Sequence, residues 1–572
     1  MKTLSKQLIE KKNRPVRVLQ YGEGNFLRAF TDYMFDVANE KGVFDGDIVI
    51  VKPRNTGNLD KFRKQDCCYT VCFRGISNGK AGVSERVVTS VREALSAYDD
   101  YEKYMSYARL DTLKYIVSNT TEAGIVYDGK DRLEDKPQSS YPGKLCSFLY
   151  ERFCYFVNGA GSNSDGKENN CRSSADNSAV SRHGLIILPV ELIDNNGAVL
   201  LDCVLKYAEQ WGLSEDFKNW LKTDCIFAST LVDRIVPGFP KDEAADMFEK
   251  WGYEDELAVT AEPYGLWIIE SEKDISAELP LKAAGMDVMF TKSLAPFKKR
   301  KVRILNGAHT SFVPASFLAG NDYVLQSIED KDIYGFIRGT LFEEIMPALV
   351  ESERRPAGMS ALVEKERRPA GMSALVEKGT EKLVSGTKSY NEGRSEDNAD
   401  GVSAEAAGSV AISEFERDCH KFAEDVLGRF ANPYVKHMHM SIALNSVSKW
   451  KTRCLPSLLD YVDFWGRLPQ RLTFSMAALI ELYRGTELKE GFLAGYRNGE
   501  KYSLSDDSAV LDFFAGASGA GTAALVKEYL GKTEFHGMDL TTIPGFADEV
   551  VKDLELIESK GIREAMKTLE LC

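Results

Sequence analysis

The hydrophobic pattern in the first half of the chain changes repeatedly between two periods. Residues 25–42 carry apolar side chains at helical spacing and stop at Gly42. Short apolar runs rich in β-forming residues lie before and after this stretch. They predict buried strands at 15–22, 47–53, 113–124 and 183–197. Strands that alternate with helices are typical of a parallel sheet with crossover helices, so we expect an α/β fold here.

The second half of the chain has mostly helical periodicity. Residues 471–485 and 546–571 carry apolar side chains at i, i+3 and i+4. The pattern changes just before a basic run that begins at Lys298. We therefore expect an N-terminal α/β domain over 1–288 and a mainly α-helical C-terminal domain over 289–572.

Two stretches depart from the globular pattern. Residues 158–182 are rich in Asn, Ser, Gly and Asp, and they cannot bury enough apolar surface to offset the entropy of ordering. Residues 351–413 contain a perfect tandem repeat, in which ERRPAGMSALVEK occurs at 353–365 and again at 366–378. Two copies are too few for a solenoid. We expect both stretches to be disordered insertions, and a partner-binding peptide is the alternative for the repeat.

Composition and charge exclude several classes of protein. The 572 residues carry a formal net charge of −14, which argues against a general nucleic-acid or membrane-surface binder. No apolar run reaches the roughly 18–20 residues of a membrane span, and the N-terminus has no apolar signal region. The 11 cysteines lack C-x-x-C spacing, as expected of reduced thiols in a cytoplasmic protein. His437 and His439 stand at i, i+2, so we expect no metal site.

A glycine pair marks the first junction between a strand and a helix. In QYGEGNF, Gly22 and Gly24 allow a tight turn and close approach of a pyrophosphate to the backbone. Leu27 stands where a full dinucleotide fingerprint has its third glycine. An ordinary structural turn is the alternative interpretation.

The end of the second predicted strand leaves the choice of dinucleotide open. An acidic residue there would accept the ribose 2′-hydroxyl of NAD, whereas a cation can hold the 2′-phosphate of NADP. This chain has Lys52 and Arg54 at that place. Two solvated loop cations are the alternative.

The basic run leads into the strongest candidate for chemistry, KKRKVRILNGAHTSF. In a helix, Asn306 and His309 share one face, and Lys301 lies five residues before the asparagine. An amide and an imidazole can donate to an oxygen that gains charge, and an amine can move the proton. Nearby like charges would lower the lysine pKa, and they come from Lys298, Lys299, Arg300 and Arg303. A solvated basic face beside a core histidine is the alternative.

Four segments in the same order resemble the mannitol dehydrogenase family, the polyol-specific long-chain dehydrogenases. They are GEGNFLRAF, SNTTEAGI, STLVDRIVPG and KVRILNGAHT. The resemblance covers nearly the whole chain outside the two insertions. It implies a Rossmann-like N-terminal domain, a helical C-terminal domain and no metal.

The resemblance also implies roles for particular residues. Lys301 becomes the general acid/base, and Asn306 and His309 polarise the carbonyl. NAD is the implied cofactor, and the matching cofactor-site residues are Gly22, Gly24, Asn25, Phe26, Asn119 and Asp233. One position departs from the pattern, because Leu192 stands where polyol-acting members carry an asparagine.

The resemblance is strongest to a branch that acts on sugar acids, so the implied partner is a small hexuronate or aldonate. Such a substrate carries a carboxylate, which a cation-rich pocket would bind. The candidate side chains for this are Arg303, Lys436, His437, Lys449 and Arg453. A relative that acts on a neutral polyol or another hexuronate is one alternative, and a non-catalytic sugar-acid-binding protein is another.

Overall fold

A computed structural model describes the chain except for 78–79, 157–182, 355–403, 485–486, 518 and 571–572. The chain forms two compact units, Met1–Lys298 and Lys299–Cys572. The division falls within helix α9 (Ala295–Arg300), whereas a boundary at 288/289 would cut strand β14 (Asp287–Thr291). The proposed insertion at 158–182 lies outside the described residues. Of the proposed insertion at 351–413, residues 351–354 and 404–413 are helical, and residues 355–403 lie outside the described part of the chain.

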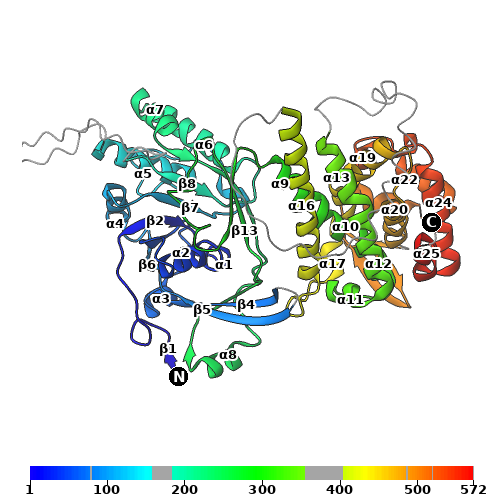
Figure 1. The fold of residues 1–572 in the computed structure, drawn as a ribbon, viewed down its shortest axis with the longest axis horizontal. Coiled ribbons are helices and arrows are strands. Elements are labelled where there is room, and N and C mark those ends of the chain that lie inside the picture. Colours follow the sequence, from blue (N-terminus) through cyan, green and yellow to red (C-terminus); the bar gives the residue numbers. More distant parts are fainter. Residues whose placement is uncertain (78–79, 157–182, 355–403, 485–486, 518, 571–572) are drawn as a thin grey trace, which may run out of the picture. The chain divides into compact units, whose positions relative to one another are not determined.

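A six-stranded parallel sheet forms the centre of the first unit (Figure 1). Its strand order is β6-β3-β2-β7-β8-β9, so the strand of this sheet that comes first along the chain, β2, lies near the middle. The bounds are β2 Val16–Tyr21, β3 Asp47–Lys52, β6 Val91–Ser96, β7 Tyr115–Ser118, β8 Ile186–Pro189 and β9 Ile226–Phe227. The expected Rossmann-like sheet is therefore confirmed, although the third and fourth predicted strands end earlier than their apolar runs.

Both faces of this sheet are buried, as the continuous apolar runs of its strands require. Val18 and Ile50 face a core shared with α1 (Asn25–Ala29) and α2 (Thr31–Glu40). Leu19 and Val49 face the opposite core, shared with α5 (Tyr141–Phe156) and α6 (Asn196–Gln210). The side chains of neighbouring strand residues thus alternate between two helix layers.

Further strands, which the sequence pattern did not predict, form smaller sheets in the same unit. One group is β12-β4-β5 and another is β10-β13-β14, while β1 pairs with β11. Their bounds are β1 Lys2–Thr3, β4 Tyr69–Ser77, β5 Lys80–Val88, β10 Ser229–Asp233, β11 Tyr253–Glu254, β12 Val259–Ala261 and β13 Leu266–Glu270. The remaining helices are α3 Asp60–Lys64, α4 Tyr101–Ser106, α7 Glu215–Thr223 and α8 Ala244–Trp251.

The second unit is mainly helical, as expected, and is built around α10 (Gly307–Leu318). This helix is buried on nearly all sides, and it contacts α12, α17, α18 and α20. The helix bounds are α11 Val324–Glu329, α12 Lys331–Gly339, α13 Met346–Arg354, α16 Ala404–Phe430, α17 His439–Ile442, α18 Ser446–Arg453, α19 Leu455–Trp465, α20 Gln470–Tyr483, α21 Ser508–Gly516, α22 Thr522–Leu530, α23 Thr533–His536, α24 Phe546–Lys560 and α25 Ile562–Lys567. A small antiparallel sheet was not predicted and comprises β15 Glu487–Lys489, β16 Phe492–Arg497 and β17 Glu500–Leu504.

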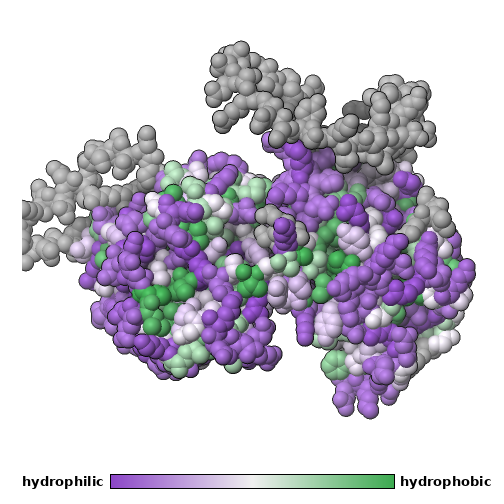
Figure 2. Space-filling model, turned by 60° about the horizontal axis from the view of Figure 1, so that its bottom comes forward, coloured by the Kyte–Doolittle hydropathy of each residue, from purple (hydrophilic) through white to green (hydrophobic). Residues whose placement is uncertain are grey.

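The face of the molecule in Figure 2 is largely hydrophilic, with scattered hydrophobic patches. Within the described part of the chain, no helix has both the length and the apolar character to cross a membrane.

Candidate active site

The candidate acid/base, Lys301, begins a π-helical turn. This turn, η3 (Lys301–Asn306), lies between α9 and α10 and closes with i→i+5 hydrogen bonds. Asn306 therefore follows Lys301 by one wide turn, and His309 lies three residues further on, at the start of α10. π-helical turns are rare and occur frequently at functional sites. Side-chain periodicity alone did not predict this turn.

His309 is enclosed by rings and cations of the same unit. Its ring centroid lies 4.2 Å from that of Phe430 and 5.3 Å from that of His437. Its Nε2 is buried and has no hydrogen-bond partner among the described residues. Burial lowers the pKa of His309 well below its usual value, and His437 and nearby arginines lower it further. A neutral imidazole with an unused polar atom is suited to bind a ligand oxygen.

Two cations of α18 lie near this histidine and its neighbour His437. Arg453 Nη1 donates to Oγ1 of Thr310 at 3.4 Å, and Thr310 is the residue directly after His309 in α10. Lys449 Nζ donates to the carbonyl of Ile442 at 2.9 Å. Burial lowers the pKa of both groups, and Arg453 lowers that of Lys449 further. His437 is half-buried, and burial followed by the charge of Lys449 lowers its pKa.

The other cations of the basic run are balanced by carboxylates. The ion pairs are Lys298 with Asp194, Lys299 with Glu353, Arg300 with Asp418, and Arg303 with Asp460. Arg303 is therefore directed to α19, and Lys436 is exposed. The like charges invoked to lower the lysine pKa are thus largely neutralised. The cationic character around His309 comes instead from Arg429 of α16 and Arg453 of α18, and Lys449 adds charge beside His437.

His439 has a structural role rather than a metal-binding one. Its Nδ1 lies 2.9 Å from the carbonyl oxygen of Asn321, which can only accept, so Nδ1 carries the proton. Its Nε2 lies 2.9 Å from Ser327 Oγ, and burial lowers the pKa of the ring to about 4. Among the residues that the structure describes, no group of three or more His, Cys, Asp or Glu side chains could hold a metal ion.

In the first unit, the glycine pair forms a turn after β2. Gly22 has φ +128°, and a Cβ there would lie 3.0 Å from the carbonyl oxygen of Asn119 and 2.9 Å from Leu27. Only glycine fits this position without strain. A Cβ on Gly24 would meet no protein atom within 4 Å, so the loop backbone is open to a ligand. Phe26 is half-buried and stacks on Phe30 at 5.0 Å.

The two cations after β3 differ in their surroundings. Lys52 is buried, and its Nζ donates to the carbonyl of Gly57 at 2.6 Å. Arg54 is exposed and reaches Thr121 Oγ1 at 3.4 Å. Glu23, between the two glycines, is half-buried, and burial raises its pKa against the opposing effects of Lys52 and Arg54.

The loop after β7 has a carboxylate partner that sequence analysis did not single out. Glu191 accepts from Thr120 N at 2.9 Å and from Ser118 Oγ at 3.0 Å, which fixes the backbone around Asn119. The only sequence signal for it was its place directly after β8. The next residue, Leu192, is 65% exposed. Asp233 is buried at the end of β10, where it pairs with Leu266.

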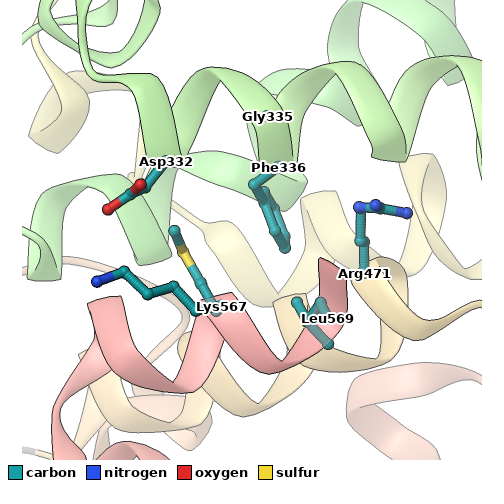
Figure 3. A pocket seen from close by; sticks show the side chains of 7 residues that line it. Asp332, Gly335, Phe336, Arg471, Lys567 and Leu569 are labelled. Carbon is teal, nitrogen blue, oxygen red and sulfur yellow. The ribbon is translucent and has the colours of Figure 1, made fainter. Parts of the chain in front are cut away.

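A separate pocket in the second unit contains none of the candidate residues. Residues of α12, α20 and α25 line it, as Figure 3 shows for Asp332, Arg471 and Lys567. Arg471 pairs with Glu343 at 2.7 Å and Lys567 with Glu564 at 2.7 Å. Two of its charged groups are thus already occupied by ion pairs.

Comparison with known proteins identifies the class of protein. The model of the mannitol dehydrogenase Rossmann domain matches residues 16–283. The model of the mannitol dehydrogenase C-terminal domain matches 293–357 and 399–558. The chain therefore belongs to the mannitol dehydrogenase family.

Individual relatives show which members of this family the chain is similar to. Altronate oxidoreductase of Shigella flexneri is 36% identical over 577 aligned residues, covering 100% of both chains. The enzyme of the same name from Escherichia coli O17:K52:H18 has the same identity and coverage. Two solved structures share the fold at 18% identity. They are substrate-free D-sorbitol dehydrogenase, with TM-score 0.68 and coverage of 99% and 100%, and a ternary complex of Pseudomonas fluorescens mannitol 2-dehydrogenase with NAD and D-mannitol, with TM-score 0.58 and coverage of 100% and 99%.

Proposed function

We propose that this protein is an NAD-dependent reductase that interconverts D-tagaturonate and D-altronate in hexuronate catabolism. Its membership of a dehydrogenase family already makes it an oxidoreductase of CH–OH groups. The observation that carries the finer proposal is the set around His309: a neutral, buried imidazole with an unused Nε2, next to two half-buried cations. The name of the 36% identical relatives agrees with this choice of substrate.

Three residues of the second unit would perform the proton chemistry. During reduction, the Lys301 ammonium gives its proton to the carbonyl oxygen, and during oxidation the neutral amine takes the hydroxyl proton. The Asn306 amide and the His309 imidazole donate to that oxygen as it gains charge. Bound NADH supplies the hydride that the carbonyl carbon accepts, so the ketone and one proton become an alcohol while NADH becomes NAD⁺.

The residues of the first unit fit a dinucleotide. The turn at Gly22 and the open backbone at Gly24 lie at the carboxyl end of β2, where open parallel sheets bind nucleotides. The buried Lys52 ammonium donates to Gly57, so it is poorly placed to hold a 2′-phosphate. Arg54 is the remaining cation of the pair, so these two residues alone do not decide between NAD and NADP. The mannitol 2-dehydrogenase neighbour is a complex with NAD.

The carboxylate of the substrate would bind to α18. Arg453 and Lys449 stand at i, i+4 and therefore share one helix face. Both are partly withdrawn from water, where an ionic hydrogen bond to a carboxylate is stronger. A neutral polyol would leave both charges without such a partner. We therefore assign Arg453 and Lys449, with His437, to the sugar acid, ahead of Arg303 and Lys436.

A substrate panel with NADH tests this proposal. We expect turnover of D-tagaturonate to exceed that of D-fructuronate and of neutral ketoses such as D-fructose. Preference for fructuronate would move the protein to mannonate formation, and preference for fructose would refute the carboxylate site. No turnover of any hexuronate, with NADH still bound, would support a non-catalytic sugar-acid-binding protein.

A further inference from the structure

The amide of Asn25 is held in one orientation at the glycine turn. Its Oδ1 accepts a hydrogen bond from Nη2 of Arg28, which has no acceptor of its own to offer. The oxygen of the amide must therefore face the arginine. The Nδ2 group has no hydrogen-bond partner among the described residues, and Asn25 itself is exposed. Position 238 is a glycine, which leaves room for this group. Any other residue there would place its Cβ only 2.5 Å from Nδ2.

Arg28 is held firmly behind the turn. It is 6% exposed, and its Nη1 donates to the carbonyl of Leu257. Its guanidinium lies 5.3 Å from the ring centroid of Tyr69, whose hydroxyl donates to Asp32 at 2.7 Å. A buried cation with fixed partners has already lost its side-chain entropy in the folded protein. It can therefore hold a neighbouring side chain in a single rotamer.

We propose that Arg28 is a positioning residue for the cofactor: by occupying Oδ1 of Asn25, it leaves Nδ2 to donate to an anionic phosphate oxygen of the dinucleotide. The buried guanidinium also adds positive charge behind the turn. This inference rests on the proposed binding of NAD to the first unit. It assigns to Arg28 a role that requires no contact with the ligand.

The variant Asn25→Asp separates this role from stability. Aspartate has the same shape and gains an ion pair with Arg28, but it presents an acceptor to the phosphate where the amide presents a donor. We expect the melting temperature to stay or rise and the Kd for NADH to increase by about tenfold to a hundredfold. NADH binding is measured by fluorescence titration of the full-length protein.

A double-mutant cycle tests whether Arg28 acts through Asn25. Arg28→Lys and Asn25→Ala should each weaken NADH binding, and the double variant should be no weaker than the Asn25→Ala variant. Arg152→Lys is the matched control, because Arg152 is also buried and donates to the carbonyls of Ala108, Leu110 and His183. It should lower the melting temperature and leave the Kd unchanged.

Two results would overturn the inference. One is wild-type affinity for NADH in Asn25→Asp, and the other is full additivity of the two losses in the double variant. A wild-type protein that binds no NADH would instead refute the proposed function itself.

Discussion

Replacement of His309 by phenylalanine should raise stability and abolish most activity. The structure gives the reason for both effects, because the same atom is buried without a partner in the fold and is the proposed donor in the reaction. His309 Nε2 is buried without a hydrogen-bond partner among the described residues, and its ring packs 4.2 Å from Phe430. Phenylalanine keeps the ring contact with Phe430 and removes the polar atom.

The sizes of both effects follow from the free energy of the unpaired Nε2 in the folded protein and of its hydrogen bond in the transition state. A buried, unsatisfied polar group destabilises by about 1–3 kcal/mol, so the variant should gain up to that amount. In a domain of roughly 150–250 residues, each kcal/mol raises the melting temperature by about 2–4 °C. Loss of one donor to a developing oxyanion lowers kcat by about 10²–10³, or roughly 2.7–4 kcal/mol.

The assay combines a thermal melt with steady-state turnover of tagaturonate and NADH. His536→Phe is the matched control, since His536 is also buried beside an aromatic ring but donates to the carbonyl of Tyr529 at 3.1 Å. It should keep its kcat and gain less stability than His309→Phe, because loss of the bond to Tyr529 opposes the removal of its own unpartnered Nδ1. Activity of His309→Phe within a few-fold of wild type would refute the role of Nε2 as a donor.

Four further predictions concern single residues. Lys301→Ala should lower kcat by about 10²–10⁴ with the Kd for NADH retained, and Lys301→Arg should not restore it, because guanidinium holds its proton near neutral pH. Gly24→Val should raise the KM for NADH far more than that for tagaturonate, since its side chain would occupy open space at the loop; equal effects would count against a cofactor loop. Arg453→Ala should raise the KM for tagaturonate by about tenfold to a hundredfold and leave turnover of a neutral ketose nearly unchanged. His439 has a pKa of about 4 when folded, so unfolding below pH 6.5 takes up a proton. The free energy of unfolding of the wild type should therefore fall by about 3 kcal/mol, relative to that of His439→Gln, between pH 7 and pH 4 in denaturant titrations.

The main architecture could be predicted because the sequence carries strong periodic signals for it. The runs that became β2 and β3 are rich in β-branched and other apolar residues, with four consecutive apolar residues in β3, which is typical of strands buried on both faces. The turn at Gly22 was also visible, because a positive φ there requires glycine. Strands such as β15–β17 were missed because they are short and half-exposed, so their apolar alternation is weak.

The candidate site could be predicted only in part. The spacing of Asn306 and His309 suggested a shared helix face, but the π-helical turn depends on tertiary contacts of η3 with α13, α16 and α18. Apart from the place of Glu191 after β8, neither Glu191 nor Arg28 carried a signal that pointed to its role. Glu191 acts on a loop far from it in sequence, and Arg28 acts on a neighbouring amide. Such partners become visible only when distant segments are brought together.

The basic run is better explained as a structural clamp, by which we mean the ion pairs of Arg300 and Arg303 that tie it to neighbouring helices, than as a substrate site. Arg300, which is 3% exposed, pairs with Asp418 of α16, and Arg303 pairs with Asp460 of α19. Both arginines are buried while Asp418 and Asp460 are about a third exposed, so these pairs can hold the π-helical turn that begins at Lys301 against its neighbouring helices. The charges that lie beside His309 belong to α16 and α18, far along the chain. Substrate preference could therefore change through Arg453 and Lys449 while the clamp, and with it the position of the proton carrier, stays intact.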